Sequence, residues 1–94
     1  MELTFEWHER KAKENLRKHG VSFDQTKSVF SDPFLLTFPD KEHSQGEERF
    51  INIGRSSRGN VLVVIHTERE GSIRIISSRK ATVSEQHTYE EGGP

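Results

Sequence analysis

Three strand-like segments, separated by two glycine-containing turns, constrain the fold of this chain more than any other feature. Residues with alternating or β-branched side chains occupy Arg49 to Arg55, Val61 to Thr67, and Ile73 to about Ser78. Turn residues separate these segments at Ser56 to Asn60 and at Glu70-Gly71. The middle segment is apolar on both faces, which favours a central position in a sheet. The pattern therefore predicts an antiparallel meander.

Further elements are expected on both sides of this meander. The signals are a helix stop at Lys18-His19-Gly20, a break at Asp32-Pro33, and two capping-box patterns, Ser22 with Gln25 and Thr82 with Glu85. They predict a strand over 4–7, helices over 8–19 and from Ser22 to about Phe30, a strand over 35–38, and a helix from Thr82 to roughly Tyr89. The expected order is β-α-α-β-β-β-β-α, an α+β fold with two N-terminal helices and one C-terminal helix.

Composition limits the class of protein. The chain has 94 residues, enough for one domain spanning residues 1–94, and only 30% of them are hydrophobic against 31% charged. That balance suits a modest sheet covered on one face. Cysteine is absent, so disulfides and thiol chemistry are excluded. No apolar run approaches the length of a membrane span, and no signal-peptide core is visible. We expect a cytoplasmic protein that does not contact a membrane.

Positive charge is concentrated in the meander although the chain as a whole is nearly neutral. The formal net charge is −1. Between positions 49 and 80 the only acidic residues are Glu68 and Glu70, whereas the basic residues there are Arg49, Arg55, Arg58, Arg69, Arg74, Arg79 and Lys80. Such a local excess of positive charge favours contact with a polyanion. The ordinary alternative is that these basic side chains lie at solvated strand ends and bind no polyanion.

The turns also suggest a register for the sheet. If Arg58-Gly59 and Glu70-Gly71 are two-residue turns, Ile51 faces His66 and His66 faces Ile75. His66, Ser77 and Arg79 would then share one face, with Arg55 at its far end, while Arg74 would lie on the other face.

Metal-free cleavage of RNA would fit these residues. That reaction needs a base for the ribose 2′-OH, an acid for the leaving oxygen, and cations for the phosphorane-like transition state. We expect His66 to carry the proton, with Glu48, Glu68 or Tyr89 as supplementary groups. A structural role for a single strand histidine is the more common alternative. The five histidines make no metal-binding spacing, and no cofactor motif occurs, so neither a metal nor a cofactor is predicted.

The motifs of this chain, taken together, resemble the BrnT family of toxins. The matching segments are Phe5-Glu6-Trp7, Lys18-His19-Gly20-Val21-Ser22-Phe23, Asp32-Pro33, Glu47-Glu48-Arg49, Thr67-Glu68-Arg69 and Arg74-Ile75-Ile76-Ser77 with Arg79. The resemblance covers nearly the whole chain. The chain departs from the family at His8, where an Asp is common, and at Glu9, where a Pro is common.

The resemblance implies a RelE-like ribonuclease that inhibits translation by cleaving RNA, free or on the ribosome. It also implies neutralisation by a BrnA-like antitoxin, a toxin–antitoxin heterotetramer, and contact with operator DNA only through the antitoxin. Arg69, Arg74 and Arg79 are the motif-matched basic positions. With His66 they form the predicted catalytic set: Arg74 and Arg79 would hold the scissile phosphate, and Arg69 would steer RNA.

RNA binding is further expected at the basic positions Arg55, Arg58 and Lys80. A non-catalytic module is the main alternative function. Such a module would use the same surface to dock the antitoxin or nucleic acid and would act in operon repression. A degenerate family member with only a structural or repressor role is a third interpretation.

Overall fold

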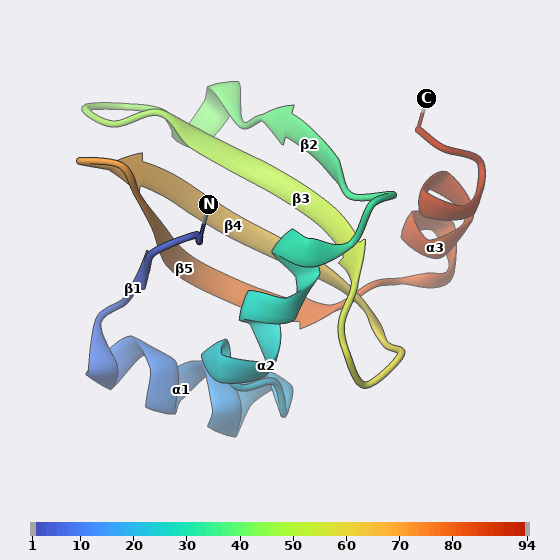
Figure 1. Ribbon diagram of the computed structural model, residues 1–94, viewed down its shortest axis with the longest axis horizontal. Coiled ribbons are helices and arrows are strands. Elements are labelled where there is room, and N and C mark those ends of the chain that lie inside the picture. Colours follow the sequence, from blue (N-terminus) through green and yellow to red (C-terminus); the bar gives the residue numbers. More distant parts are fainter. Residues whose placement is uncertain (1, 94) are drawn as a thin grey trace.

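The computed structural model describes residues 2–93, which form one mixed sheet and three α-helices (Figure 1). The elements in chain order are β1 (Phe5–Glu6), α1 (Glu9–His19), α2 (Phe23–Lys27), the 3₁₀ turn η1 (Ser28–Ser31), β2 (Leu36–Pro39), the 3₁₀ turn η2 (Lys41–His43), β3 (Arg49–Arg55), β4 (Val61–Arg69), β5 (Ser72–Lys80) and α3 (Val83–Glu90). The predicted α+β class and element order are confirmed.

The strand order in the sheet is β1-β5-β4-β3-β2. Strands β2 to β5 form the expected antiparallel meander. Strand β1 instead pairs parallel to β5, with Phe5 opposite Ile73 and Glu6 opposite Arg74. The sheet is therefore mixed rather than wholly antiparallel. This placement carries the start of α1 to the edge of β5.

Local sequence signals set the helix boundaries. Gly20 ends α1 in the left-handed conformation, with φ of 69°, and its N–H bonds to the carbonyl of Leu16. The Ser22 hydroxyl accepts from the backbone N–H of Gln25, as the capping pattern predicts. The α-helical part then stops at Lys27, because Ser28 begins a 3₁₀ turn and its hydroxyl bonds back to the carbonyl of Gln25. The expected second helix is thus split in two.

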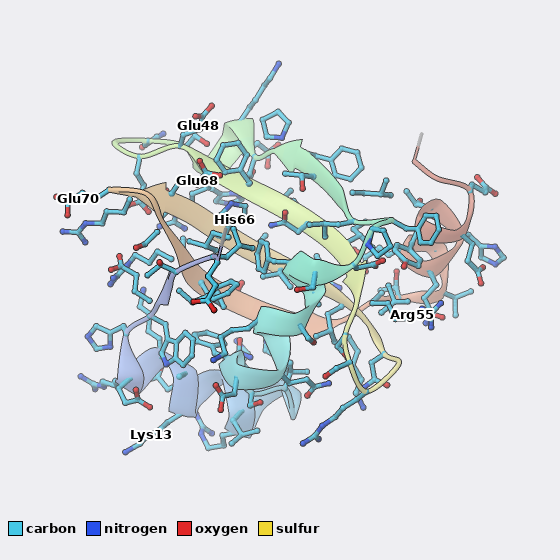
Figure 2. All side chains as sticks on the ribbon, in the orientation of Figure 1. Lys13, Glu48, Arg55, His66, Glu68 and Glu70 are labelled. Atoms are coloured by element: carbon cyan, nitrogen blue, oxygen red, sulfur yellow. The ribbon has the colours of Figure 1, made fainter. Side chains whose placement is uncertain are left out.

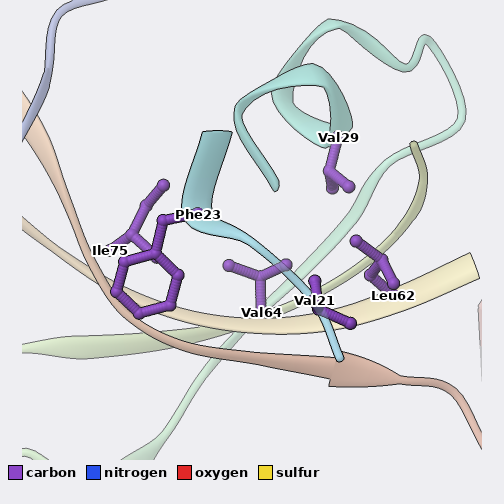
Figure 3. Packing of buried hydrophobic residues seen from close by; sticks show 6 residues of the cluster. All are labelled: Val21, Phe23, Val29, Leu62, Val64 and Ile75. Carbon is purple, nitrogen blue, oxygen red and sulfur yellow. The ribbon is translucent and has the colours of Figure 1, made fainter. Parts of the chain in front are cut away.

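The two faces of the sheet are covered unequally. Helices α1 and α2 with η1 lie against one face, called here the helix face, and bury the main core (Figures 1 and 3). That core consists of Val21, Phe23, Val29, Leu62, Val64 and Ile75. The opposite face, called here the open face, carries a smaller cluster of Ile53, Val63 and Tyr89, and the last of these comes from α3. Helix α3 therefore covers only one end of the open face.

A buried side chain fixes α1 on β5. The amide of Asn15 donates to the carbonyls of Val21 at 2.9 Å and Ser78 at 2.8 Å, and its oxygen accepts from the Ser78 N–H at 3.1 Å. All three bonds join buried groups, where an unpaired polar atom is costly. Asn15 therefore sets the position of the helix along the strand.

Within residues 2–93, no helix has the length and apolar character needed to cross a membrane.

The predicted register is half wrong, and two local features explain the error. Ile51 faces Ile65, not His66, because five residues from Ser56 to Asn60 connect β3 and β4 instead of a two-residue turn. His66 faces Ile75 as expected, but the next pair is Ile65 with Ser77, so β5 bulges by one residue. The bulge moves Ser77 and Arg79 to the open face, whereas His66 stays on the helix face.

Candidate functional site

A basic hollow lies on the open face, at the end of the sheet where β4 turns into β5. Its volume is about 280 Å³. It is lined by His8, Lys11, Glu47, Arg49, Arg69, Arg74, Ile75 and Ile76. We call this site the basic hollow. The β4–β5 turn lies at the end of the sheet away from α3, which covers the other end of the same face (Figure 1).

Strand register brings the arginines of the basic hollow together. Arg49 is opposite Thr67, and Thr67 is opposite Arg74, so the three side chains form a row across β3, β4 and β5. Arg69 follows two residues after Thr67 and returns to the same face. The N-terminal segment contributes His8 and Lys11, because the parallel pairing of β1 leads α1 along the edge of β5.

Internal partners neutralise the basic hollow only in part. The Arg49 Nε lies 3.3 Å from an oxygen of Glu47, and the Arg74 Nη1 lies 3.4 Å from an oxygen of Glu6. Both pairs are partly exposed, and such pairs contribute little net energy. Among residues 2–93, no carboxylate forms an ion pair with Arg69. The positive charge that remains can be satisfied by an external anion.

Arg79 lies outside the basic hollow. It sits opposite Val63, four residues along β4 from the partner of Arg74. Its guanidinium donates two hydrogen bonds, of 2.8 and 2.9 Å, to the carboxylate of Glu85 in α3. This bidentate contact lowers the pKa of Glu85 to about 2 and raises the pKa of Arg79. The structure thus brings Arg69 and Arg74 together but uses Arg79 to hold α3.

His66 is buried on the helix face, with 3% of its surface exposed (Figure 2). Its ring lies between Phe30, in an edge-on contact at 5.2 Å, and Phe50, in a stacked contact at 5.1 Å. Burial lowers the pKa of His66, against an opposing influence of Glu68. The predicted common face of His66 and Arg79 is therefore wrong. Sheet and side chains separate the imidazole of His66 from the basic hollow.

Hydrogen bonds also fix the tautomer of His66. The Asn52 oxygen accepts from the hydroxyl of Thr37 at 2.9 Å, so the Asn52 amide donates to Nδ1 of His66 at 2.6 Å. The hydrogen of the imidazole is then on Nε2, which lies 3.6 Å from a carboxylate oxygen of Glu68. The bond that Asn52 donates to Nδ1 favours the neutral ring, whereas Glu68 favours the charged ring.

The other predicted RNA-binding residues lie at the opposite end of the sheet. Arg55, labelled in Figure 2, donates to the carbonyl of Gly59 at 2.9 Å, and its guanidinium stacks 5.6 Å from the centre of the Tyr89 ring. The Tyr89 hydroxyl donates to Asp32 at 2.6 Å, and burial followed by this bond raises the pKa of Tyr89. A second hollow, of about 360 Å³, is lined by Arg55, Gly59, Asn60, Val61, Lys80, Ala81, Gln86 and Glu90. Arg58 is exposed in the adjoining β3–β4 loop.

Sequence reasoning missed part of the basic hollow. The expected supplementary groups are Glu48, Glu68 or Tyr89, whereas the carboxylate that lines the site is Glu47. Strand alternation could not have placed Glu47 there, because Glu47 lies in a bend before β3 begins at Arg49. No sequence signal pointed to His8 and Lys11, because their position depends on the parallel pairing of β1.

Fold and site together define a small α+β protein that presents arginines from the uncovered face of a mixed sheet. Residues 7–85 match the family described as the ribonuclease toxin, BrnT, of type II toxin–antitoxin systems. The chain therefore belongs to the BrnT family of ribonuclease toxins, and the resemblance seen in its motifs is confirmed.

A solved structure supports the same assignment. The fold is similar to the crystal structure of the Brucella abortus ribonuclease toxin BrnT, with a TM-score of 0.68 and 25% sequence identity. The match covers 86% of this chain and 99% of that one. Among curated proteins, no relative matches this sequence.

Proposed function

We propose that this protein is an endoribonuclease toxin that inhibits translation by cleaving RNA without a metal ion. Membership of a family of ribonuclease toxins supports the reaction class. The observation that carries the proposal is the convergence of Arg49, Arg69 and Arg74 on one hollow. Guanidinium groups suit this task because they stay charged and bind phosphate oxygens through fixed pairs of donors.

The arginines of the basic hollow have distinct tasks in this proposal. Arg74 and Arg69 bind the scissile phosphate and stabilise the negative charge that grows on it in the transition state. Arg49 lies in the same row and completes the phosphate site. At the other end of the sheet, Arg55, Arg58 and Lys80 contact the RNA backbone beyond the cleavage point. Arg79 and His66, predicted to act directly, support the site by holding α3 and the strand core.

Neutralisation by a BrnA-like antitoxin follows from the same surface. The basic hollow adjoins open-face side chains that are only partly buried, including Ile51, Ile65 and Phe38. A segment of antitoxin with acidic and apolar residues would pair with both features and exclude RNA. We propose that toxin and antitoxin assemble as a heterotetramer in the cytoplasm, and that operator DNA is contacted only through the antitoxin.

Growth and RNA integrity after induced expression in bacteria test this function. Wild type should arrest growth and leave fragmented RNA on a gel. The double variant Arg69→Ala/Arg74→Ala should do neither. The matched control is Arg10→Ala/Arg17→Ala, which removes the same charge from exposed positions of α1. Normal growth and intact RNA with well-expressed, folded wild type would contradict the proposal.

A non-catalytic binding module is the second candidate, because a basic hollow can dock an acidic segment without any chemistry. It predicts that the purified protein binds antitoxin and RNA but leaves RNA intact, with or without ribosomes. Fragmentation that requires Arg69 and Arg74 would exclude this candidate.

A further inference from the structure

The basic hollow contains two proton-transfer groups among its arginines. One is the carboxylate of Glu47 and the other is the imidazole of His8. We propose that Glu47 is the general base and His8 the general acid of RNA cleavage. This inference rests on the proposed ribonuclease function and names the groups that would perform its chemistry.

Glu47 is held at the site and remains open to substrate. Its oxygen lies 3.3 Å from the Nε of Arg49, while 46% of its side chain is exposed. Glu47 lies in the loop before β3, two positions before Arg49, and lines the same hollow. Arg49 contacts one oxygen of the carboxylate and leaves the second oxygen free to approach a ribose hydroxyl.

His8 reaches the basic hollow from the N-terminal segment. It lies at the position preceding α1, but its side chain makes no capping hydrogen bond to the helix. The residue is exposed, so its imidazole is accessible to a bound nucleotide. Histidine is the side chain best suited to donate a proton near neutral pH. Glu47 and His8 come from different segments but line the same hollow as the arginines, where both could act on one bound phosphate.

The proposed reaction is an internal transfer at phosphorus. Glu47 removes the proton of the 2′-OH as the 2′ oxygen forms a bond to phosphorus. The bond from phosphorus to the 5′ oxygen breaks, and His8 gives its proton to that oxygen. The products are a 2′,3′-cyclic phosphate and a 5′-hydroxyl. Glu47 is then protonated and His8 is neutral. Glu47 loses one proton to solvent and His8 takes up one proton from solvent, which restores the enzyme.

Other candidates for these roles are placed less well. Glu48 does not line the basic hollow, and a carboxylate oxygen of Glu68 lies 3.6 Å from Nε2 of the buried His66. Tyr89 is engaged by Asp32 at the opposite end. The charged groups that do face Glu47 and His8 are Lys11, Arg49, Arg69 and Arg74, with Glu6 bound to Arg74.

Two conservative variants test the assignment on a single-stranded RNA oligonucleotide with purified protein. Glu47→Gln should slow cleavage at saturating RNA about 100-fold or more, while RNA affinity stays within about threefold. His8→Gln should slow cleavage about 10- to 100-fold. Glu48→Gln, an equal charge change one residue away, is the matched control and should retain wild-type cleavage.

A modified substrate separates the two roles. Replacing the 5′ leaving oxygen by sulfur at the cleavage site makes protonation of the leaving group unnecessary. This substrate should restore cleavage by His8→Gln but not by Glu47→Gln. Fast cleavage by Glu47→Gln, or no rescue of His8→Gln by sulfur, would overturn the corresponding assignment. Wild type that leaves RNA intact would instead overturn the ribonuclease function itself.

Discussion

The two ends of the open face carry similar numbers of arginines but use them differently. At the β4–β5 end, Arg69 and Arg74 line an open hollow with only weak internal pairing. At the α3 end, Arg79 is bound by both oxygens of Glu85, and Arg55 stacks on Tyr89. A guanidinium that is bound inside the protein has fewer donors left for a ligand, whereas one with weak internal pairing has most of its donors free. The end proposed to cleave RNA therefore differs from the other end in its free guanidinium donors and not in its number of arginines.

The largest expected effect comes from emptying the basic hollow of arginines. Replacing Arg49, Arg69 and Arg74 by Ala should reduce cleavage about 1000-fold or more, because phosphate binding and transition-state stabilisation are lost together. The slope of log Kd against log salt concentration should fall by about 0.7, since the three arginines share one phosphate and each phosphate neutralised on a single strand contributes about that much. RNA titrations at several salt concentrations measure this. An unchanged slope would place RNA elsewhere on the surface.

Protonation of His66 gives the next largest effect, on stability. The pKa of His66 is lowered from the ordinary value of 6.5, so below that pH the histidine binds a proton more readily in the unfolded chain than in the folded chain. The contribution of His66 to the free energy of unfolding should therefore be fully present above pH 6.5. Below pH 6.5 the free energy of unfolding should fall, by at most about 1.4 kcal/mol per pH unit. The His66→Gln variant keeps an acceptor for Asn52 but cannot titrate there. Urea unfolding between pH 7.5 and 5.5 should show that the free energy of unfolding falls more steeply with pH in wild type than in His66→Gln. Equal pH dependence in the two proteins would contradict a neutral, buried His66.

The ion pair at the α3 end should give a smaller loss of stability. The Glu85→Gln variant removes the charge opposite Arg79 but can still accept from the Thr82 N–H. Because the pair is partly exposed, we expect a loss of about 1 kcal/mol at pH 7. Glu85 has a pKa of about 2 rather than 4.5, so this difference should vanish as pH falls from 4.5 to 2. Thermal unfolding measures it, and cleavage should stay within about threefold of wild type.

The smallest effect is expected from the exposed cations near α3. The double variant Arg58→Ala/Lys80→Ala should weaken RNA binding about threefold and leave the cleavage rate at saturating RNA unchanged. The reason is that in the proposed complex these residues contact the backbone away from the reacting phosphate. A loss of cleavage as large as that of the variant without Arg49, Arg69 and Arg74 would show that both ends of the open face bind the reacting region of the RNA.

Most elements of this fold could be predicted from local signals. Gly20, Ser22 and the Thr82–Glu85 capping box end or begin helices where expected, because caps act through neighbouring residues. The register could not be predicted in full. A five-residue loop and a bulge at Ile65/His66 each shift the pairing by one residue. A shift of one residue moves the side chains of a strand to the opposite face of the sheet.

The candidate site was predictable only where it lies on the strands. Arg69 and Arg74 stand out as cations of a sheet, and the structure places both in the basic hollow. The role expected for His66 depended on a face that the bulge rearranges. The proximity of His8 to Arg74 depends on long-range pairing of β1 with β5, which leaves no periodic signal in the chain.

A direct comparison of Arg74→Ala with Arg79→Ala tests the central claim. Each variant loses one strand arginine from the open face, so the charge change is the same. The measurement is the single-turnover cleavage rate of one RNA oligonucleotide, at a temperature where both proteins are folded. Arg74→Ala should be slower than wild type by about 100-fold, and Arg79→Ala by no more than about threefold. The opposite order would contradict the account and place the reacting phosphate beside α3.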